Sequence, residues 1–228
     1  MLKLIYLLTL APQKEQNKNI MDKISLPSGA IIGAAGELYP HAHKVLRLGD
    51  DICLALGRVH EVLGDSADVF ALIAAAKVSG PVLWCGGGTD IGTLAPTAIQ
   101  DFLDPARLLL VEGVSRGEVM WSAEQALRMS GVGVVIVELR DGPDLRESRR
   151  FQIACEESGA LGLILIEGRA QTSAAETRWD CHAVSSAAYD WEWRCTKNRK
   201  GEPGIWQVKW QGGRDGQDIV HLVAATAA

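Results

Sequence analysis

The chain has 228 residues, a length that suits one α/β domain with short appendages. Hydrophobic residues make up 47% of it and charged residues 22%, so it has enough apolar material for one sizeable core and does not resemble a disordered protein. The net charge of −5 argues against a protein that coats DNA through bulk electrostatics, although it leaves room for a local basic patch. No segment approaches a run of about 18 apolar residues, so no membrane span is expected.

The cysteines are informative through their number and spacing. There are five of them, an odd number, and no two are spaced as C-x-x-C. This pattern disfavours a zinc site or a complete disulfide framework. We therefore expect reduced thiols inside the core of a cytoplasmic protein.

The N-terminal part of the chain has little pattern. Residues 1–23 are predicted to be a disordered leader. They resemble a signal peptide only faintly, because they carry one lysine in the first eleven residues and no A-x-A-like cleavage site. Met21 offers an alternative start. Residues 24–228 are expected to form a single domain, in which residues 24–57 are loosely patterned turn material.

A regular alternation of strands and helices begins at Arg58. The first unit has a strand over 58–64, a helix over 66–78 with a single apolar stripe, and a strand over 81–85. Strand, helix and strand at these spacings are typical of a mostly parallel sheet covered on both faces. Further along, strands are expected over 107–111, 132–139 and 160–166, and helices over 115–129 and 147–157. The helix over 115–129 is predicted to begin with a capping box at Ser115 and Glu118.

The pattern of apolar and polar residues changes in the C-terminal region. Apolar and polar residues alternate in two runs. The apolar positions are Trp191, Trp193 and Cys195 in the first run and Trp206, Val208 and Trp210 in the second. This pattern predicts an antiparallel β-hairpin with one aromatic and one polar face, and residues 219–223 are a candidate edge strand. The sequence therefore predicts an α/β fold: a mostly parallel sheet flanked by helices, with a C-terminal antiparallel β-hairpin.

The turn between the first strand and the first helix is the usual place for a phosphate-binding loop of the pattern G-x-x-x-x-G-K-[ST]. Here Gly64 is followed by Asp65, Ser66, Ala67 and Asp68, with no second glycine and no lysine. We interpret Ser66 as the helix N-cap and the two aspartates as acids that complement the helix dipole, rather than as a metal-binding pair.

Other candidates for chemistry are weaker. We interpret Glu138, at the end of a strand, as a solvated or arginine-paired carboxylate rather than a metal ligand. The glycine-rich residues 86–90 are interpreted as a flexible loop rather than an anion nest. His41 and His43 have ligand-like spacing but no further ligands nearby. No nucleophile lies in a nucleophile-elbow context. We predict no catalytic residue, no metal and no cofactor.

Several segments together resemble known families. The stretch 48–64 is similar to the segment that introduces the phosphate loop of RecA. Downstream segments resemble ImuA, the RecA-like accessory protein of bacterial damage-induced mutagenesis whose phosphate loop is often degenerate. The resemblance covers about residues 46–211 and is carried by segments 82–85, 103–111, 121–128, 148–154, 174–179 and 197–210.

This resemblance implies a RecA-like fold and a non-enzymatic accessory role in translesion DNA synthesis under SOS control. The implied partners are ImuB, a catalytically dead relative of Y-family polymerases, and an error-prone polymerase, with RecA and weak DNA contact as further candidates. The chain departs from an active RecA in three places. The stretch 64–80 is about five residues short, glycines replace the water-activating glutamate at 86–88, and Glu138 replaces a magnesium-associated aspartate. We therefore expect no ATPase activity.

Basic residues at the predicted hairpin tip are the leading candidates for binding DNA or a partner. Lysines and arginines between aromatic strands can hold phosphates, although a polar tip also keeps a sheet edge soluble. A second candidate is the helix over 147–157. The tryptophans, Trp121 among them, are expected mostly in the core, although they would also suit a docking face. The candidate binding residues are Lys197, Arg199, Lys200, Arg194 and Lys209 at the hairpin, and Arg149 and Arg150 on the helix.

Two rival functions remain open from the sequence. One is a SulA-like inhibitor of cell division, also a RecA relative without a phosphate loop, although such chains are usually shorter and lack the 197–210 hairpin signature. The other is a RecA-like DNA-dependent ATPase with an unconventional loop, which predicts magnesium-dependent nucleotide binding.

Overall fold

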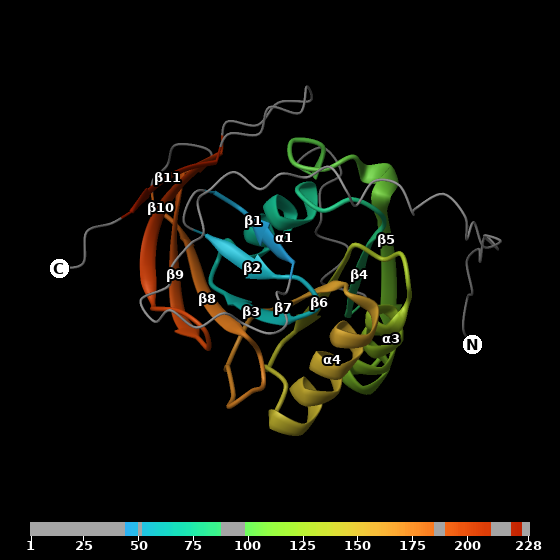
Figure 1. Cartoon of the computed structure of the whole chain (residues 1–228). Coiled ribbons are helices and arrows are strands. Elements are labelled where there is room, and N and C mark those ends of the chain that lie inside the picture. Colours follow the sequence, from blue (N-terminus) through green and yellow to red (C-terminus); the bar gives the residue numbers. More distant parts are fainter. Residues whose placement is uncertain (1–43, 50–51, 88–98, 185–189, 211–219, 225–228) are drawn as a thin grey trace, which may run out of the picture. The chain divides into compact units, whose positions relative to one another are not determined.

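The computed structural model describes residues 44–49, 52–87, 99–184, 190–210 and 220–224 (Figure 1). The predicted leader over 1–23, and His41 and His43, lie outside these residues. None of the helices that the structure describes is long and apolar enough to cross a membrane.

The core of the fold is a sheet of nine described strands in the order β11-β10-β9-β8-β3-β7-β6-β4-β5. From β8 to β5 all neighbouring strands are parallel, whereas β8, β9, β10 and β11 pair antiparallel. The predicted α/β class with a C-terminal hairpin is therefore confirmed, and the antiparallel part is larger than expected. The strands are β3 (Val59–Leu63), β4 (Val82–Gly87), β5 (Leu108–Gly113), β6 (Val134–Leu139), β7 (Leu161–Ile166), β8 (Thr177–Ala183), β9 (Asp190–Asn198), β10 (Gly204–Trp210) and β11 (Val220–Ala224).

Helices cover both faces of this sheet. On one face α1 (Ala67–Ala76) packs against β3, β7 and β8. On the other face lie α3 (Arg116–Arg128) and α4 (Leu145–Ser158), which also contact each other (Figure 1). A short 3-10 turn, η2 (Pro105–Arg107), precedes β5. A two-stranded sheet of β1 (Val45–Arg47) and β2 (Cys53–Ala55), which the sequence did not predict, contributes to the core on the α1 face.

The helix ends follow local capping chemistry. At the start of α4 the Asp144 side chain accepts the backbone N–H of Glu147, whose carboxylate accepts the N–H of Asp144, so this helix has a complete capping box. The box predicted for α3 is only half formed. Ser115 accepts the N–H of Glu118, but the Glu118 carboxylate accepts the N–H of Val114 instead of that of Ser115.

Two hydrophobic cores fill the space between sheet and helices. Because successive side chains of a strand point to opposite faces, Leu163 of β7 packs on the α1 side and Ile164 on the α3–α4 side. The α1 side also holds the aromatic face of the C-terminal strands. The ring of Phe70 on α1 lies 5.4 Å from that of Trp179 and 4.6 Å from that of Trp193, between ring centroids. The predicted two-faced hairpin is thereby confirmed.

Trp121 differs from the tryptophans that the structure shows buried in the core. The prediction that it belongs to the core is wrong, since 59% of it is exposed. On α3 the residues that face the sheet are Val119, Ala123 and Leu127, and the 100° turn per residue places Trp121 on the side away from them.

Candidate functional site at the carboxyl edge of the sheet

Ligands of open parallel sheets bind beyond the carboxyl ends of the strands, so the loop between β3 and α1 is the first place to examine. Gly64 begins this loop with φ of +96°, a conformation that residues with a side chain rarely adopt. A Cβ atom at Gly64 would lie 2.1 Å from the carbonyl oxygen of Cys181 on β8. The loop therefore lies directly against the neighbouring strand.

Hydrogen bonds hold the loop in this position. The backbone N–H of Ser66 donates to the Cys181 carbonyl at 3.2 Å, and the N–H of Ala183 donates to Asp65 Oδ1 at 3.0 Å. The Ser66 hydroxyl also donates to Asp65 Oδ1, so Ser66 stands at the N-cap position of α1 without capping the helix through its side chain. An N–H group that a phosphate loop would direct at its ligand is thus bonded to β8.

The charge at this edge is negative. The N–H of Ala183 holds the pKa of the Asp65 carboxyl below its usual value, with help from Ser66 and His182. His182 lies between two carboxylates, with Nε2 3.0 Å from Asp180 and Nδ1 3.5 Å from Asp65. Asp68 adds a further carboxylate in the first turn of α1. The described residues of this loop and of the adjoining end of β8 would present carboxylates and no lysine to a nucleotide phosphate.

The ends of the other parallel strands complete the edge. Gly86 and Gly87 belong to β4 and pair with Glu112 and Gly113 of β5, so the prediction of a flexible loop is wrong for these two glycines. Glu138 lies half-buried near the end of β6. Among the described residues no group of three or more histidine, cysteine, aspartate or glutamate side chains is placed to hold a metal ion.

A hollow of about 900 Å³ lies beside this edge, between the loops after β6 and β7. Some of its polar groups form hydrogen bonds within the fold: the Asp141 carboxylate accepts the N–H of Arg169, and the Gln171 side chain donates to the carbonyl of Gly142. Arg178, which also lines the hollow, is tied to Glu61.

Two buried polar arrangements beneath the edge were not predicted. Trp179 Nε1–H donates to the Thr177 hydroxyl at 2.7 Å, that oxygen lies 2.7 Å from His60 Nδ1, and His60 Nε2 lies 3.0 Å from the Ala55 carbonyl. A neutral His60 that donates through Nε2 and accepts through Nδ1 satisfies this whole chain of contacts. Burial lowers the pKa of His60 to about 4, which keeps it neutral.

The second buried arrangement is a charge pair across two strands. Glu61 of β3 is fully buried, and its Oε2 accepts the Nε–H of Arg178 on β8 at 2.7 Å. The alternation of apolar and polar residues over 177–183 could have predicted β8. The sequence alone does not show that β8 pairs with β3.

The cysteines are free thiols, as predicted, and most of them are buried. Burial raises the pKa of Cys85 and of Cys155 to about 12. These thiols stay protonated and act as small core side chains rather than as nucleophiles.

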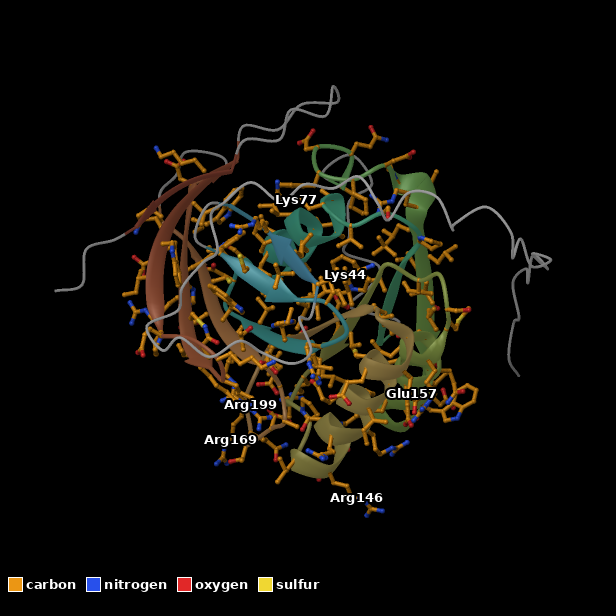
Figure 2. All side chains as sticks on the ribbon, viewed as in Figure 1. Lys44, Lys77, Arg146, Glu157, Arg169 and Arg199 are labelled. Atoms are coloured by element: carbon orange, nitrogen blue, oxygen red, sulfur yellow. The ribbon has the colours of Figure 1, made fainter. Side chains whose placement is uncertain are left out.

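The predicted basic residues of the hairpin tip come together, but they contact the segment before β8. Lys197 Nζ donates to the carbonyl of Ser173 at 2.9 Å, and burial lowers its pKa. Arg199 Nη1 donates to the carbonyl of Ala174 at 3.2 Å. Lys200 Nζ lies 3.7 Å from a carboxylate oxygen of Glu176. We call Lys197, Arg199 and Lys200 the tip cluster. Figure 2 shows Arg199 of this cluster far from two other cations, Lys44 and Lys77.

The other predicted cations are dispersed. Arg194 lies 3.3 Å from Glu192 and Lys209 lies 3.3 Å from Asp190, so both are paired on the polar face of the C-terminal strands. On α4 the Arg150 side chain is paired with Glu124 of α3. Arg149 is exposed and has no ion-pair or hydrogen-bond partner among the described residues. The structure therefore brings the three residues of the tip cluster together, whereas Arg150 is engaged by Glu124 on α3.

Fold and edge together define an α/β protein whose first parallel strand, β3, is joined to α1 by the short segment Gly64–Ser66. This segment occupies the place of the phosphate loop of nucleotide-binding α/β proteins. No protein-family model matches the chain. It is similar to two curated proteins named Protein ImuA, from Caulobacter vibrioides strains NA1000 and CB 15. Each is 30% identical over 206 residues, which cover 76% of this chain and 83% of the relative. The chain belongs to the ImuA family.

Proposed function

We propose that this protein is a non-enzymatic adaptor in damage-induced mutagenesis. Membership of the ImuA family supports the biological process. The observation that carries the non-enzymatic part is the loop at Gly64–Ser66, which is bonded to β8 and carries Asp65 where a phosphate would need positive charge and free N–H groups. Phosphoryl transfer depends on that cradle, its lysine and a metal, so a site of this kind would not turn over ATP.

The adaptor would act in the cytoplasm by holding proteins together at a stalled replication end. The partners we propose are an ImuB-like protein and an error-prone polymerase under SOS control, with RecA as a further partner. The support for these partners is the family alone. Direct binding to DNA gains no support from the paired cations Arg194 and Lys209, since paired charges release fewer counterions on binding phosphates.

The experiment is the frequency of ultraviolet-induced mutation in a strain deleted for the gene, with survival scored in parallel. We expect induced mutation to collapse and to be restored by the wild-type gene. A Lys197→Ala/Arg199→Ala/Lys200→Ala variant tests the tip cluster. The matched control is Lys44→Ala/Lys77→Ala, which removes cations distant from it (Figure 2).

Each outcome separates the functions. Restoration by the control but not by the tip-cluster variant, with both proteins equally folded by circular dichroism, supports the adaptor role and assigns the cluster to it. Restoration by both variants supports the adaptor role and removes the cluster from it. An unchanged induced mutation frequency in the deletion strain contradicts the proposal; altered cell length under damage would then favour the division inhibitor.

A further inference from the structure

The outer strand β5 presents an apolar edge. In the described part of the chain β5 pairs with β4 alone and ends the sheet (Figure 1). Two of its central residues are large, apolar and half-exposed: 53% of Leu109 and 51% of Leu110 are accessible. The pairing with β4 places Leu109 beside Leu83 and Leu110 beside Trp84, so the two leucines lie on opposite faces of the sheet. The strand therefore offers apolar side chains on both faces.

This edge carries few of the features that usually protect one, and Glu112 is the charged side chain of the described strand. Natural edge strands carry lysine, proline or a bulge, which stop another strand from adding to them. The described strand Leu108–Gly113 contains neither lysine nor proline, and its register with β4 runs without a shift from Leu108 to Gly113. Its backbone can therefore pair on the outer side with an extended segment, which is a common mode of peptide recognition.

The charges that flank the edge are negative. Between positions 104 and 118 the sequence carries three carboxylates, at Asp104, Glu112 and Glu118, and two arginines.

Both arginines are held by groups elsewhere in the fold. Arg107 donates to backbone carbonyls at the end of α1, among them that of Ala75 at 3.3 Å, and to that of Gly80 at 3.0 Å. Arg116 forms a two-pronged pair with Glu147 of α4, at 2.6 and 2.8 Å. Glu147 balances the charge of Arg116, whereas Arg107 keeps its charge next to the carbonyl end of α1. The carboxylates still outnumber this one unbalanced arginine, so the flanks of the edge keep an acidic character.

We propose that β5 is a docking strand for a partner protein, which adds an extended segment with apolar residues in its centre and lysine or arginine at its ends. The backbone of β5 supplies the hydrogen bonds, Leu109 and Leu110 supply the apolar contacts, and the acidic flanks select basic ends. A second copy of this chain suits the edge less well, because two β5 edges would bring like carboxylates together. The proposal does not depend on a role in mutagenesis.

The test uses the full-length protein and fluorescently labelled peptides. The probe is Lys-Arg-Val-Thr-Val-Ile-Val-Lys-Arg, and a matched peptide carries glutamate at each basic position. Binding is measured by fluorescence anisotropy at low salt. We expect the basic peptide to bind at least about tenfold more tightly than the acidic one, with the difference shrinking as salt screens the charges.

Variants locate the binding on β5. Leu109→Ser/Leu110→Ser and Leu110→Lys are each expected to weaken binding of the basic peptide by about tenfold or more. Val184→Ser is the matched control, since Val184 is 51% exposed and lies outside this edge, and it should bind like the wild type. Circular dichroism and urea unfolding of each variant show whether the fold is kept; replacing half-exposed side chains should cost little stability.

Three outcomes would overturn the proposal. The first is the absence of binding, and the second is equal binding by folded wild type and Leu110→Lys. The third is self-association of the wild type in sedimentation that Leu110→Lys abolishes, since this would assign the edge to a second copy of the chain.

Discussion

The close approach of Gly64 to β8 can be tested by adding one methyl group. In Gly64→Ala the new Cβ would lie 2.1 Å from the carbonyl oxygen of Cys181. The backbone fixes the position of the Cβ, and the oxygen is itself a backbone atom, so no side-chain rotation can relieve the clash. The positive φ of +96° adds a conformational cost of about 1–2 kcal/mol for alanine. The strand and the loop must therefore separate, or the loop must change its path.

The size of the effect follows from the bonds that separation would break. The Ser66 N–H to Cys181 bond contributes about 0.5–1.5 kcal/mol, and the Ala183 N–H to Asp65 carboxylate bond about 1.5–3 kcal/mol. With the conformational cost, Gly64→Ala should lower the free energy of unfolding by about 3–6 kcal/mol, a large share of the stability of a typical domain.

The chain offers a matched control at Gly131. This glycine has φ of +87°, and a Cβ there would have no atom within 4 Å. Gly131→Ala should therefore cost only the conformational part, about 1–2 kcal/mol. Both variants are compared with the wild type by urea unfolding, with the slope m checked for constancy. Equal destabilisation by the two substitutions would refute the close packing of the loop against β8.

Two further predictions concern the buried polar groups. Burial lowers the pKa of His60 to about 4, below the value near 6.5 of an unfolded chain, so the unfolded state binds more protons between these values. Stability should therefore fall by up to about 3 kcal/mol as pH drops from 6.5 to 4, and His60→Gln should flatten this dependence in urea unfolding measured across the range. Glu61→Gln removes the charge that faces Arg178 and should lower the free energy of unfolding by about 1.5–3 kcal/mol. The control Glu192→Gln, at the pair with Arg194, should lower it by less than about 1 kcal/mol. Equal losses of stability would show that burial of Glu61 adds nothing to its pair with Arg178.

The inner parallel strands were predictable because they are buried on both faces and read as short apolar runs, as 161–166 does. The C-terminal hairpin was predictable from the alternation around Trp193. Two features were present in the sequence but missed. The alternation over 177–183 marks β8, and helical spacing from Val119 and Ala123 places Trp121 outside.

The remaining features depend on contacts between residues far apart in the chain. Asp65 accepts a hydrogen bond from Ala183, 118 positions away, so the sequence shows the missing phosphate loop but not what bonds to its replacement. Lys197 likewise donates to the backbone carbonyl of Ser173, which precedes β8 and lies 24 positions earlier in the chain. A cation at a hairpin tip looks free in sequence, and only the fold shows what it contacts.

The claim that the carboxyl edge of β3 is closed to nucleotides is tested most directly by titration calorimetry of the full-length protein with MgATP. No binding at millimolar nucleotide is the expected result, because Asp65 and the bond from Ser66 to β8 leave no cradle for the phosphates. The Ser66→Asp variant adds a further negative charge to the loop. Magnesium-dependent binding of ATP to the wild type that this variant loses would contradict the account and favour an ATPase with an unconventional loop.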